Sequence, residues 1–158
     1  MGEATLLKTL LGIVKPFDGE VHLGDYLEVG YFEQESSHEN TNTALQEVWN
    51  EFPGLDNVDV RRALAKCGLT NDHITSQMRV LSGGEAAKVR LCKIMLKEIN
   101  FLVLDEPTNH LDVGAKDELK RAIQDFKGTV LLVSHEPEFF MDIVNDVWNI
   151  EDFTTKIV

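Results

Sequence analysis

Two continuous apolar runs, each ending in polar residues, constrain the fold of this chain most strongly. Residues 101–106 (FLVLDE) and 129–136 (TVLLVSHE) have no apolar/polar alternation, which is typical of strands covered on both faces of a parallel sheet. Residues 112–126, which lie between them, have the spacing of an amphipathic helix. Together the three segments predict a βαβ unit with a right-handed crossover, and therefore an α/β fold.

Further helices and strands are expected around this unit. Apolar residues recur at helical spacing in four other segments: residues 5–14, 43–52, 59–69 and 136–144. Gly68 is the expected C-cap of the helix in residues 59–69. Three short segments are interpreted as strands: residues 19–24 and 25–34, joined as a hairpin, and residues 146–152.

These expectations divide the chain into two parts. The helices between residues 43 and 98 predict a small helical subdomain. Residues 1–35 and 99–158 are expected to form the α/β core. A chain of 158 residues with 43% hydrophobic residues can bury one such core, so the two parts are expected to belong to a single domain.

Two adjacent carboxylates end the first apolar strand. Asp105 and Glu106 are expected at the carboxyl edge of the parallel sheet, where open α/β folds bind their ligands. An aspartate in that place can hold Mg²⁺, and the next carboxylate can orient or deprotonate an attacking water. A solvated acidic turn is the alternative for these two residues alone.

A glycine-rich helix start precedes this strand. Ser82 and Glu85 of LSGGE fit a capping box, and the helix that follows has an apolar face: Ala86, Val89, Cys92, Leu96 and Ile99. A capped core helix explains those residues. Gly83 and Gly84 also leave the amides of the helix N-terminus bare, and such an end is suited to an anion.

Composition excludes several classes of protein. The net charge of -12 argues against a chain that grips nucleic acid by itself, because such binding requires clustered Lys and Arg. No apolar run reaches the roughly 18 residues of a membrane span, so a cytoplasmic location is expected. Cys67 and Cys92 are too few for a disulfide framework or a zinc site, and both are expected to be buried thiols.

The order LSGGE, FLVLDEPTNHLD and LLVSHE resembles the signature motif, the Walker B motif with its D-loop, and the switch histidine of ABC-type ATPase domains. Glu85 and the PTNHLD run resemble the ABC-F class in particular, whose members are soluble tandem ATPases that act on ribosomes. The resemblance covers nearly the whole chain and is greater to the second domain of that class. It implies a P-loop NTPase-like parallel sheet flanked by helices, with a small helical signature subdomain.

The resemblance also implies roles for individual residues. Glu106, His135 and Gln34 would be catalytic, and Asp105 with Gln34 would hold the Mg²⁺ that accompanies ATP. Other residues would contact nucleotide in the chain itself or across a dimer: Gly2, Thr5, Ser82, Gly83, Gly84, Glu85 and Asp112. For Asp112 a helix N-cap is a second expected role. The implied partners are a second ABC domain in a head-to-tail ATP sandwich and, for a full-length parent protein, the ribosome.

The start of the chain departs from the family pattern. The phosphate-binding loop G-x-x-x-x-G-K-[ST] can be placed only from its second glycine, Gly2, so that Glu3 and Ala4 occupy the lysine and hydroxyl positions. A truncated domain is therefore expected to be inactive alone, with no tightly bound cofactor and with a sheet edge open to self-association. SHEPEFF also differs from the SHDRYF common in the class. A transporter ATPase subunit and a non-enzymatic partner that completes another domain's site remain alternatives.

Overall fold

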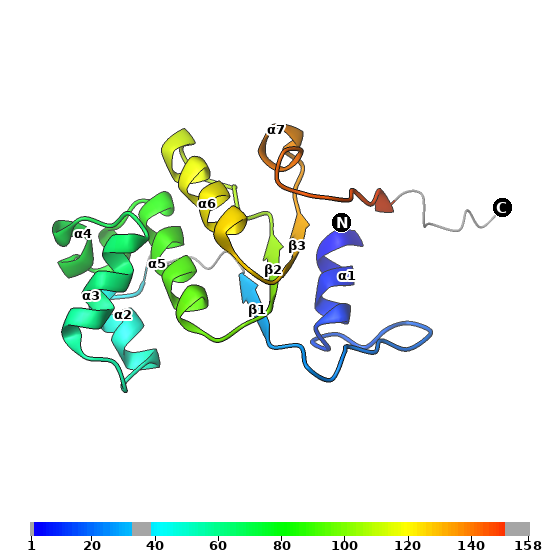
Figure 1. Ribbon diagram of the computed structural model, residues 1–158, viewed down its shortest axis with the longest axis horizontal. Coiled ribbons are helices and arrows are strands. Elements are labelled where there is room, and N and C mark those ends of the chain that lie inside the picture. Colours follow the sequence, from blue (N-terminus) through cyan, green and yellow to red (C-terminus); the bar gives the residue numbers. More distant parts are fainter. Residues whose placement is uncertain (1, 33–38, 151–158) are drawn as a thin grey trace.

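A computed structural model describes residues 2–32 and 39–150 of the chain. Their core is a parallel sheet of three strands, β1 (Val29–Phe32), β2 (Phe101–Asp105) and β3 (Thr129–Val133), in the order β1-β2-β3. Helix α6 (Val113–Asp125) connects β2 to β3 (Figure 1). The predicted βαβ unit and the α/β fold class are therefore confirmed.

The middle strand is buried as its continuous apolar sequence predicts. Leu102, Val103 and Leu104 of β2 are at most 1% exposed. Strand β3 is different, because its residues are only partly buried and Thr129 is exposed. One flank of the sheet is thus less covered than its centre.

Five helical elements lie between β1 and β2 in the described part of the chain. They are α2 (Ala44–Glu51), α3 (Asn57–Lys66), α4 (Asn71–Thr75), the 3₁₀ turn η1 (Met78–Val80) and α5 (Gly83–Leu96). Reciprocal capping boxes start α2, α4 and α5, formed by the pairs Thr43 with Gln46, Thr70 with His73 and Ser82 with Glu85. In each box two backbone N–H groups at the helix start donate hydrogen bonds to side chains. The first residue of each of these helices is therefore well defined.

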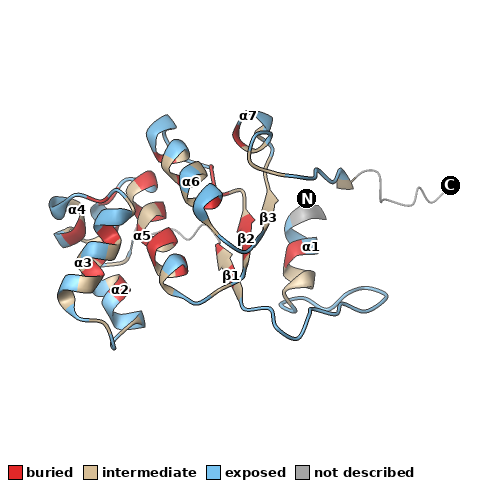
Figure 2. Cartoon of the chain, viewed as in Figure 1, coloured by how far each residue is buried: buried red, intermediate tan, exposed pale blue. Residues whose placement is uncertain are grey.

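Helix α5 belongs to two hydrophobic clusters at once. Its residues Ala86, Val89 and Cys92 pack with α2, α3 and α4. Residues on another side of the same helix pack against the sheet and α6: Ala87, Leu91 and Ile94. Figure 2 shows buried residues along much of this helix. The apolar face predicted from the sequence is present as far as Leu96, whereas Ile99 lies beyond the helix and packs with the sheet.

Two of the expected strands are absent from the described residues. Residues 11–28 follow helix α1 (Gly2–Leu10) and contain no strand, so the hairpin over residues 19–34 is wrong apart from β1. Residues 146–149 of the expected final strand are irregular as well. A strand requires a neighbouring strand for its backbone groups, and the exposed residues 19–24 pair with no described strand. Helix α7 (Pro137–Phe140) is shorter than the predicted one.

Candidate functional site

Asp105 and Glu106 lie at the carboxyl edge of the sheet, as expected from the end of β2. The backbone N–H of Glu106 donates to the carbonyl of Val133 on β3 (2.9 Å), which ties the two strand ends together. Glu106 has a φ of 45°, a left-handed conformation that is uncommon for a residue other than glycine. Strained backbone of this kind is concentrated at functional sites, so the turn after β2 is the first candidate.

The carboxylate of Glu106 meets the histidine that follows β3. Nε2 of His135 lies 3.1 Å from Oε1 of Glu106, an ion pair when the imidazole is protonated. Oε1 is buried, and apart from this imidazole, whose approach lacks the geometry of a hydrogen bond, no described group donates to it. The His135 side chain is 73% exposed, whereas that of Glu106 is 22% exposed. The pair therefore presents an imidazole to solvent and keeps behind it a buried carboxylate oxygen that can still accept a hydrogen bond.

Asp105 lies within hydrogen-bond reach of a side chain on β1. The hydroxyl of Tyr31 on β1 donates to its Oδ2 at 3.4 Å, a long hydrogen bond. Carboxylate oxygens are the ligands that Mg²⁺ prefers, and one or two of them with water and phosphate oxygens form its usual site. The carboxylate of Asp105 can be a ligand of such an ion, and Oε1 of Glu106, which accepts no hydrogen bond, can accept one from a water bound to it. The two side chains therefore fit Mg²⁺ with its waters. Among the residues that the structure describes, no group of three or more His, Cys, Asp or Glu forms a metal cage.

The turn between β2 and α6 is connected to the histidine segment by Glu136, a residue that sequence reasoning missed. The buried Thr108 donates its hydroxyl to Oε1 of Glu136 (3.0 Å), and Nζ of Lys116 pairs with Oε2 (2.6 Å). The hydrogen bond from Lys116 holds the pKa of Glu136 below its ordinary value of 4.5. The only signal in the sequence is the position of Glu136 directly after His135.

Asp112 is the N-cap of α6, one of its two expected roles. Its Oδ1 accepts from the backbone N–H of Ala115 at 2.7 Å. The preceding His110 has a φ of 61°, so the segment turns sharply before the helix begins. The cap defines how the 107–112 segment enters α6.

The glycine-rich start of α5 packs directly on that segment. The predicted capping box is present, since Ser82 accepts from the Glu85 N–H (3.2 Å) and Glu85 accepts from the Ser82 N–H (2.9 Å). A Cβ added at Gly83 would lie 3.1 Å from the carbonyl oxygen of His110, and one at Gly84 would lie 3.0 Å from the Cβ of Ala115. The glycines thus permit a close approach between α5 and residues 110–115, a reason that the sequence did not reveal.

Two other predicted site residues lie on α1, and one lies outside the described residues. Gly2 is the first residue of α1, and the exposed Thr5 accepts a hydrogen bond on its carbonyl from the Thr9 hydroxyl (2.8 Å). Gln34 is not among the described residues. The structure therefore brings together Asp105, Glu106 and His135, while Ser82, Gly83 and Gly84 adjoin the 110–115 segment.

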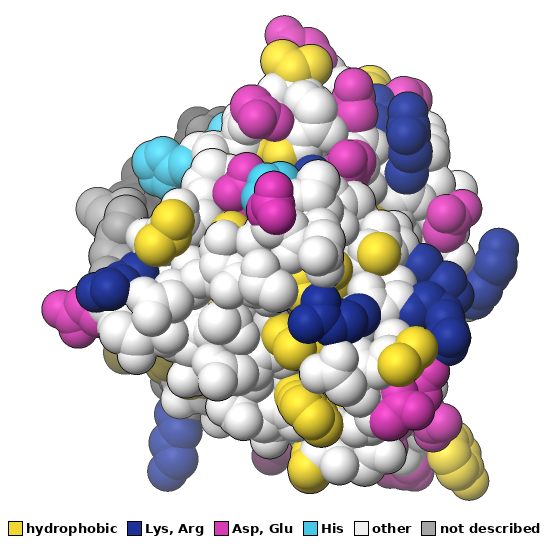
Figure 3. All heavy atoms as spheres, turned by 90° about the vertical axis from the view of Figure 1, so that its left-hand side faces the viewer, with side chains coloured by type: hydrophobic (Ala, Val, Ile, Leu, Met, Phe, Trp, Pro, Cys, Tyr) yellow, Lys and Arg dark blue, Asp and Glu magenta, His cyan; other side chains and the backbone are white. Residues whose placement is uncertain are grey.

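The surface over the helical elements carries charges of both signs. On the face shown in Figure 3, Lys and Arg side chains lie among Asp, Glu and hydrophobic side chains. This mixture differs from the continuous basic surface of a protein that binds nucleic acid by itself. None of the helices described here is long and apolar enough to cross a bilayer.

Comparison with known proteins identifies relatives of the chain. A family model described as ABC transporter matches residues 1–109. The Bacillus subtilis protein named uncharacterized ABC transporter ATP-binding protein YfmM is 57% identical over 158 residues, which are 100% of this chain and 30% of YfmM. ABC transporter F family member 5 of Arabidopsis thaliana is 40% identical over 154 residues, 96% of this chain and 22% of that protein. The chain thus spans less than a third of either relative.

A solved structure has the same fold. The archaeal ribosome recycling factor aABCE1, solved in complex with an archaeal ribosomal stalk protein, matches with a TM-score of 0.69 and 26% identity. The match covers 90% of this chain and 28% of that one.

Proposed function

The chain belongs to the ABC transporter family, and we propose from that premise that it is part of an ATP-hydrolysing domain of the ABC-F type. Family domains of this kind bind ATP, which is the coarse function of the chain. The finer assignment is supported by the LSGGE and PTNHLD sequences and by the likeness to the Arabidopsis F family member.

One observation carries the proposal: the carboxylate of Glu106 and the imidazole of His135 meet at the end of the sheet, with Asp105 next to them. In this assignment Glu106 orients the attacking water and accepts its proton, since its Oε1 has no other described hydrogen-bond donor. His135 is exposed enough to contact the transferred phosphoryl group. Asp105 holds Mg²⁺, which supplies charge neutralisation for that group when bound.

The start of α5 is assigned to a partner's nucleotide. The N-terminus of a 14-residue helix carries a partial positive charge, and Ser82 and Gly83 at this end are exposed. We assign the contact to ATP held by a second ABC domain in a head-to-tail pair, with Asp112 and Glu85 near the same surface. Each site then requires two domains.

The 158 residues by themselves are proposed to be inactive. Glu3 and Ala4 occupy the positions where the family pattern has a lysine and a hydroxyl residue, so an acid replaces the cation that meets the phosphates. Phosphoryl transfer depends on positioning and charge stabilisation, and this substitution opposes both.

A test restores the missing chemistry. The chain is extended by a complete G-x-x-x-x-G-K-[ST] loop and its leading strands, with Lys and Thr in place of Glu3 and Ala4. We expect MgATP binding and turnover in the extended protein and neither in the original chain. Glu106→Gln is expected to retain ATP and lose turnover by about 10²-fold or more, because the amide cannot accept the proton. Equal turnover with Glu106→Gln, measured as phosphate release, would refute the mechanism.

The pairing step has a matched control. Ser82→Arg is expected to prevent pairing in the extended protein while ATP still binds, because a bulky cation covers the helix end. Ser82 also caps α5, so Ser82→Ala is the control that removes the cap alone, at a cost of about 1 kcal/mol. Turnover by Ser82→Arg as a strict monomer, shown by sedimentation, would contradict the shared site.

The parent protein is proposed to act on ribosomes in the cytoplasm. This rests on the F-type motifs and on the likeness to a ribosome recycling factor. Co-sedimentation of the full-length protein with ribosomes in the presence of a non-hydrolysable ATP analogue tests it. Recovery with membranes and a membrane-embedded partner instead would favour the transporter subunit.

A further inference from the structure

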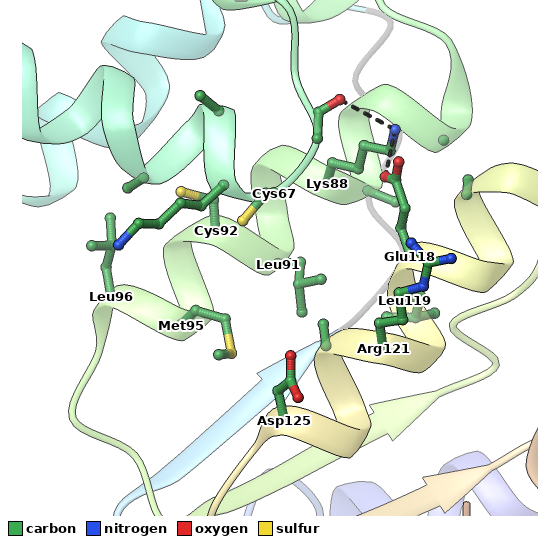
Figure 4. A pocket seen from close by; sticks show the side chains of 18 of the residues that line it. Cys67, Lys88, Leu91, Cys92, Met95, Leu96, Glu118, Leu119, Arg121 and Asp125 are labelled. Carbon is green, nitrogen blue, oxygen red and sulfur yellow. Dashed lines mark hydrogen bonds and ion pairs between the residues drawn. The ribbon is translucent and has the colours of Figure 1, made fainter. Parts of the chain in front are cut away.

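The two cysteines of the chain face each other across the contact between α3 and α5. Cys67 is the C-cap of α3, and Cys92 lies within α5. Both side chains line one cavity, and Figure 4 shows both sulfur atoms at the same wall of it. Cys92 belongs to the hydrophobic cluster between these helices and Cys67 packs against it, so a disulfide between them would join two helices that already pack together.

The cavity gives one of the two thiols access to solvent. It has a volume of about 670 Å³ and lies between α3, α5 and α6. Cys67 is partly exposed, in contrast to the expectation of two buried thiols, whereas Cys92 is 1% exposed. A small oxidant in the cavity therefore reaches Cys67 first, and Cys92 is held behind it.

The groups around the two cysteines also favour Cys67 as the first thiol to react. The neighbouring Cys92 thiol lowers the pKa of Cys67, and nearby Lys88 lowers it further, while burial and Glu118 oppose them. The neighbouring Cys67 side chain and burial raise the pKa of the Cys92 thiol. Lys88 itself is held over this site by an ion pair with Glu118 (2.6 Å). Since the thiolate is the reactive form, Cys67 is the nucleophile of the pair.

We propose that Cys67 and Cys92 are a redox-modified dithiol, oxidised by hydroperoxides to an intramolecular disulfide that ties α3 to α5. The Cys67 thiolate attacks the terminal oxygen of the hydroperoxide and breaks the O–O bond, and the other oxygen leaves as water or alcohol after protonation. The resulting sulfenic acid is attacked by the Cys92 sulfur, which loses its proton as the second water departs. In sum two thiols lose two hydrogens, and one hydroperoxide is reduced.

The unmodified chain provides the test, since it has no other cysteine. The protein is treated with a slight excess of hydrogen peroxide under native conditions, and free thiols are counted after unfolding. Both thiols should disappear together, and dithiothreitol should restore both. Tryptic digestion without reduction should yield residues 67–79 linked to residues 91–93. Non-reducing electrophoresis should show a monomer.

Two variants separate the roles of the cysteines. Cys92→Ala should accumulate a sulfenic acid on Cys67 that dimedone traps. Cys67→Ser should leave Cys92 unreacted at the same peroxide dose, because it is buried. The peptide map of the unmodified chain remains decisive if a variant does not fold. Persistence of both thiols at doses that oxidise an exposed cysteine, or linkage only between chains, would overturn the proposal. Neither result bears on ATP hydrolysis, whose residues lie elsewhere.

Discussion

The helical region (residues 44–96) and the sheet region (residues 2–32 and 101–150) close their cores to different extents. Ala44, Val48, Val60 and Leu64 of the helical region are each 0% exposed. In the sheet region, Phe17 is fully exposed and Trp148 is 75% exposed, and no described strand lies beside β3 on its outer edge. The helical region therefore completes its core with its own residues, whereas the sheet region leaves apolar surface that further contacts would cover. On this basis we propose that residues from about 43 to 98 form a helical subdomain, separate from the α/β core.

The largest expected effect comes from emptying the helical core. Leu64→Ala should lower the free energy of unfolding by about 3 kcal/mol, because Leu64 is 0% exposed and its removal leaves a cavity. Leu132→Ala on β3 removes the same atoms from a partly buried place and should cost about 1 kcal/mol. Urea unfolding followed by circular dichroism gives both values. Equal losses would mean that the two regions are equally closed.

A smaller effect should follow from adding a methyl group at a glycine in each region. A Cβ at Gly128 would overlap the backbone carbonyl of Asn100, which also accepts from the Thr129 N–H at the start of β3. Gly128→Ala should therefore destabilise the sheet region by about 1–3 kcal/mol. Gly54, in the loop after α2, has nothing within 4 Å of an added Cβ. Gly54→Ala should be neutral or stabilise by about 0.5 kcal/mol, and a loss similar to that of Gly128→Ala in thermal unfolding would contradict the geometry.

The smallest effect is the acid sensitivity of the helical region. Lys93 on α5 pairs with Glu47 (3.1 Å) and Glu51 (2.7 Å) on α2. Burial alone would raise the pKa of Glu47, but hydrogen bonds from Asn40 and Lys93 lower it below its ordinary 4.5. A carboxyl group whose pKa is lowered on folding stabilises the fold at pH values above its ordinary pKa. This contribution is lost as the pH falls through the lowered pKa of the folded protein.

The free energy of unfolding should therefore be lower at about pH 3 than at about pH 7. In Lys93→Met this difference between the two pH values should be smaller by about 1 kcal/mol. The exposed pair of Arg62 and Asp59 offers a matched control. Arg62→Met should leave the pH dependence unchanged, because exposed ion pairs contribute little. An equal change in both variants would remove the distinction between the two pairs.

Local signals in the sequence predicted structure well because they depend on neighbours in the chain. The capping box of Ser82 and Glu85 appears as expected. Gly68 does end α3 in the left-handed conformation (φ 84°), one residue beyond the C-cap, which is Cys67 and not Gly68 as predicted. The hairpin before β1 was wrong because alternating residues describe a strand only when a neighbouring strand exists. Residues 19–24 have the composition of a strand and no described partner.

The site was predictable in part for the same reason. The strand ends place Asp105, Glu106 and His135 at one edge by topology alone, and the structure does bring Glu106 and His135 within 3.1 Å. Glu136 was missed because its partners Thr108 and Lys116 are 28 and 20 residues away. Neither periodicity nor a motif in the sequence predicts contacts between residues so far apart in the chain. The catalytic roles of these residues remain predictions.

The position of α5 between two clusters restricts how its sequence can change over generations. A substitution at Val89 must suit α2, α3 and α4, and one at Leu91 must suit the sheet and α6. Because the helix is a rigid rod of roughly 21 Å, a shift that accommodates a larger side chain on one face displaces the other. Accepted changes in α5 are therefore expected in compensating pairs drawn from both regions, so that the two regions diverge together although their cores share no other helix among the described residues.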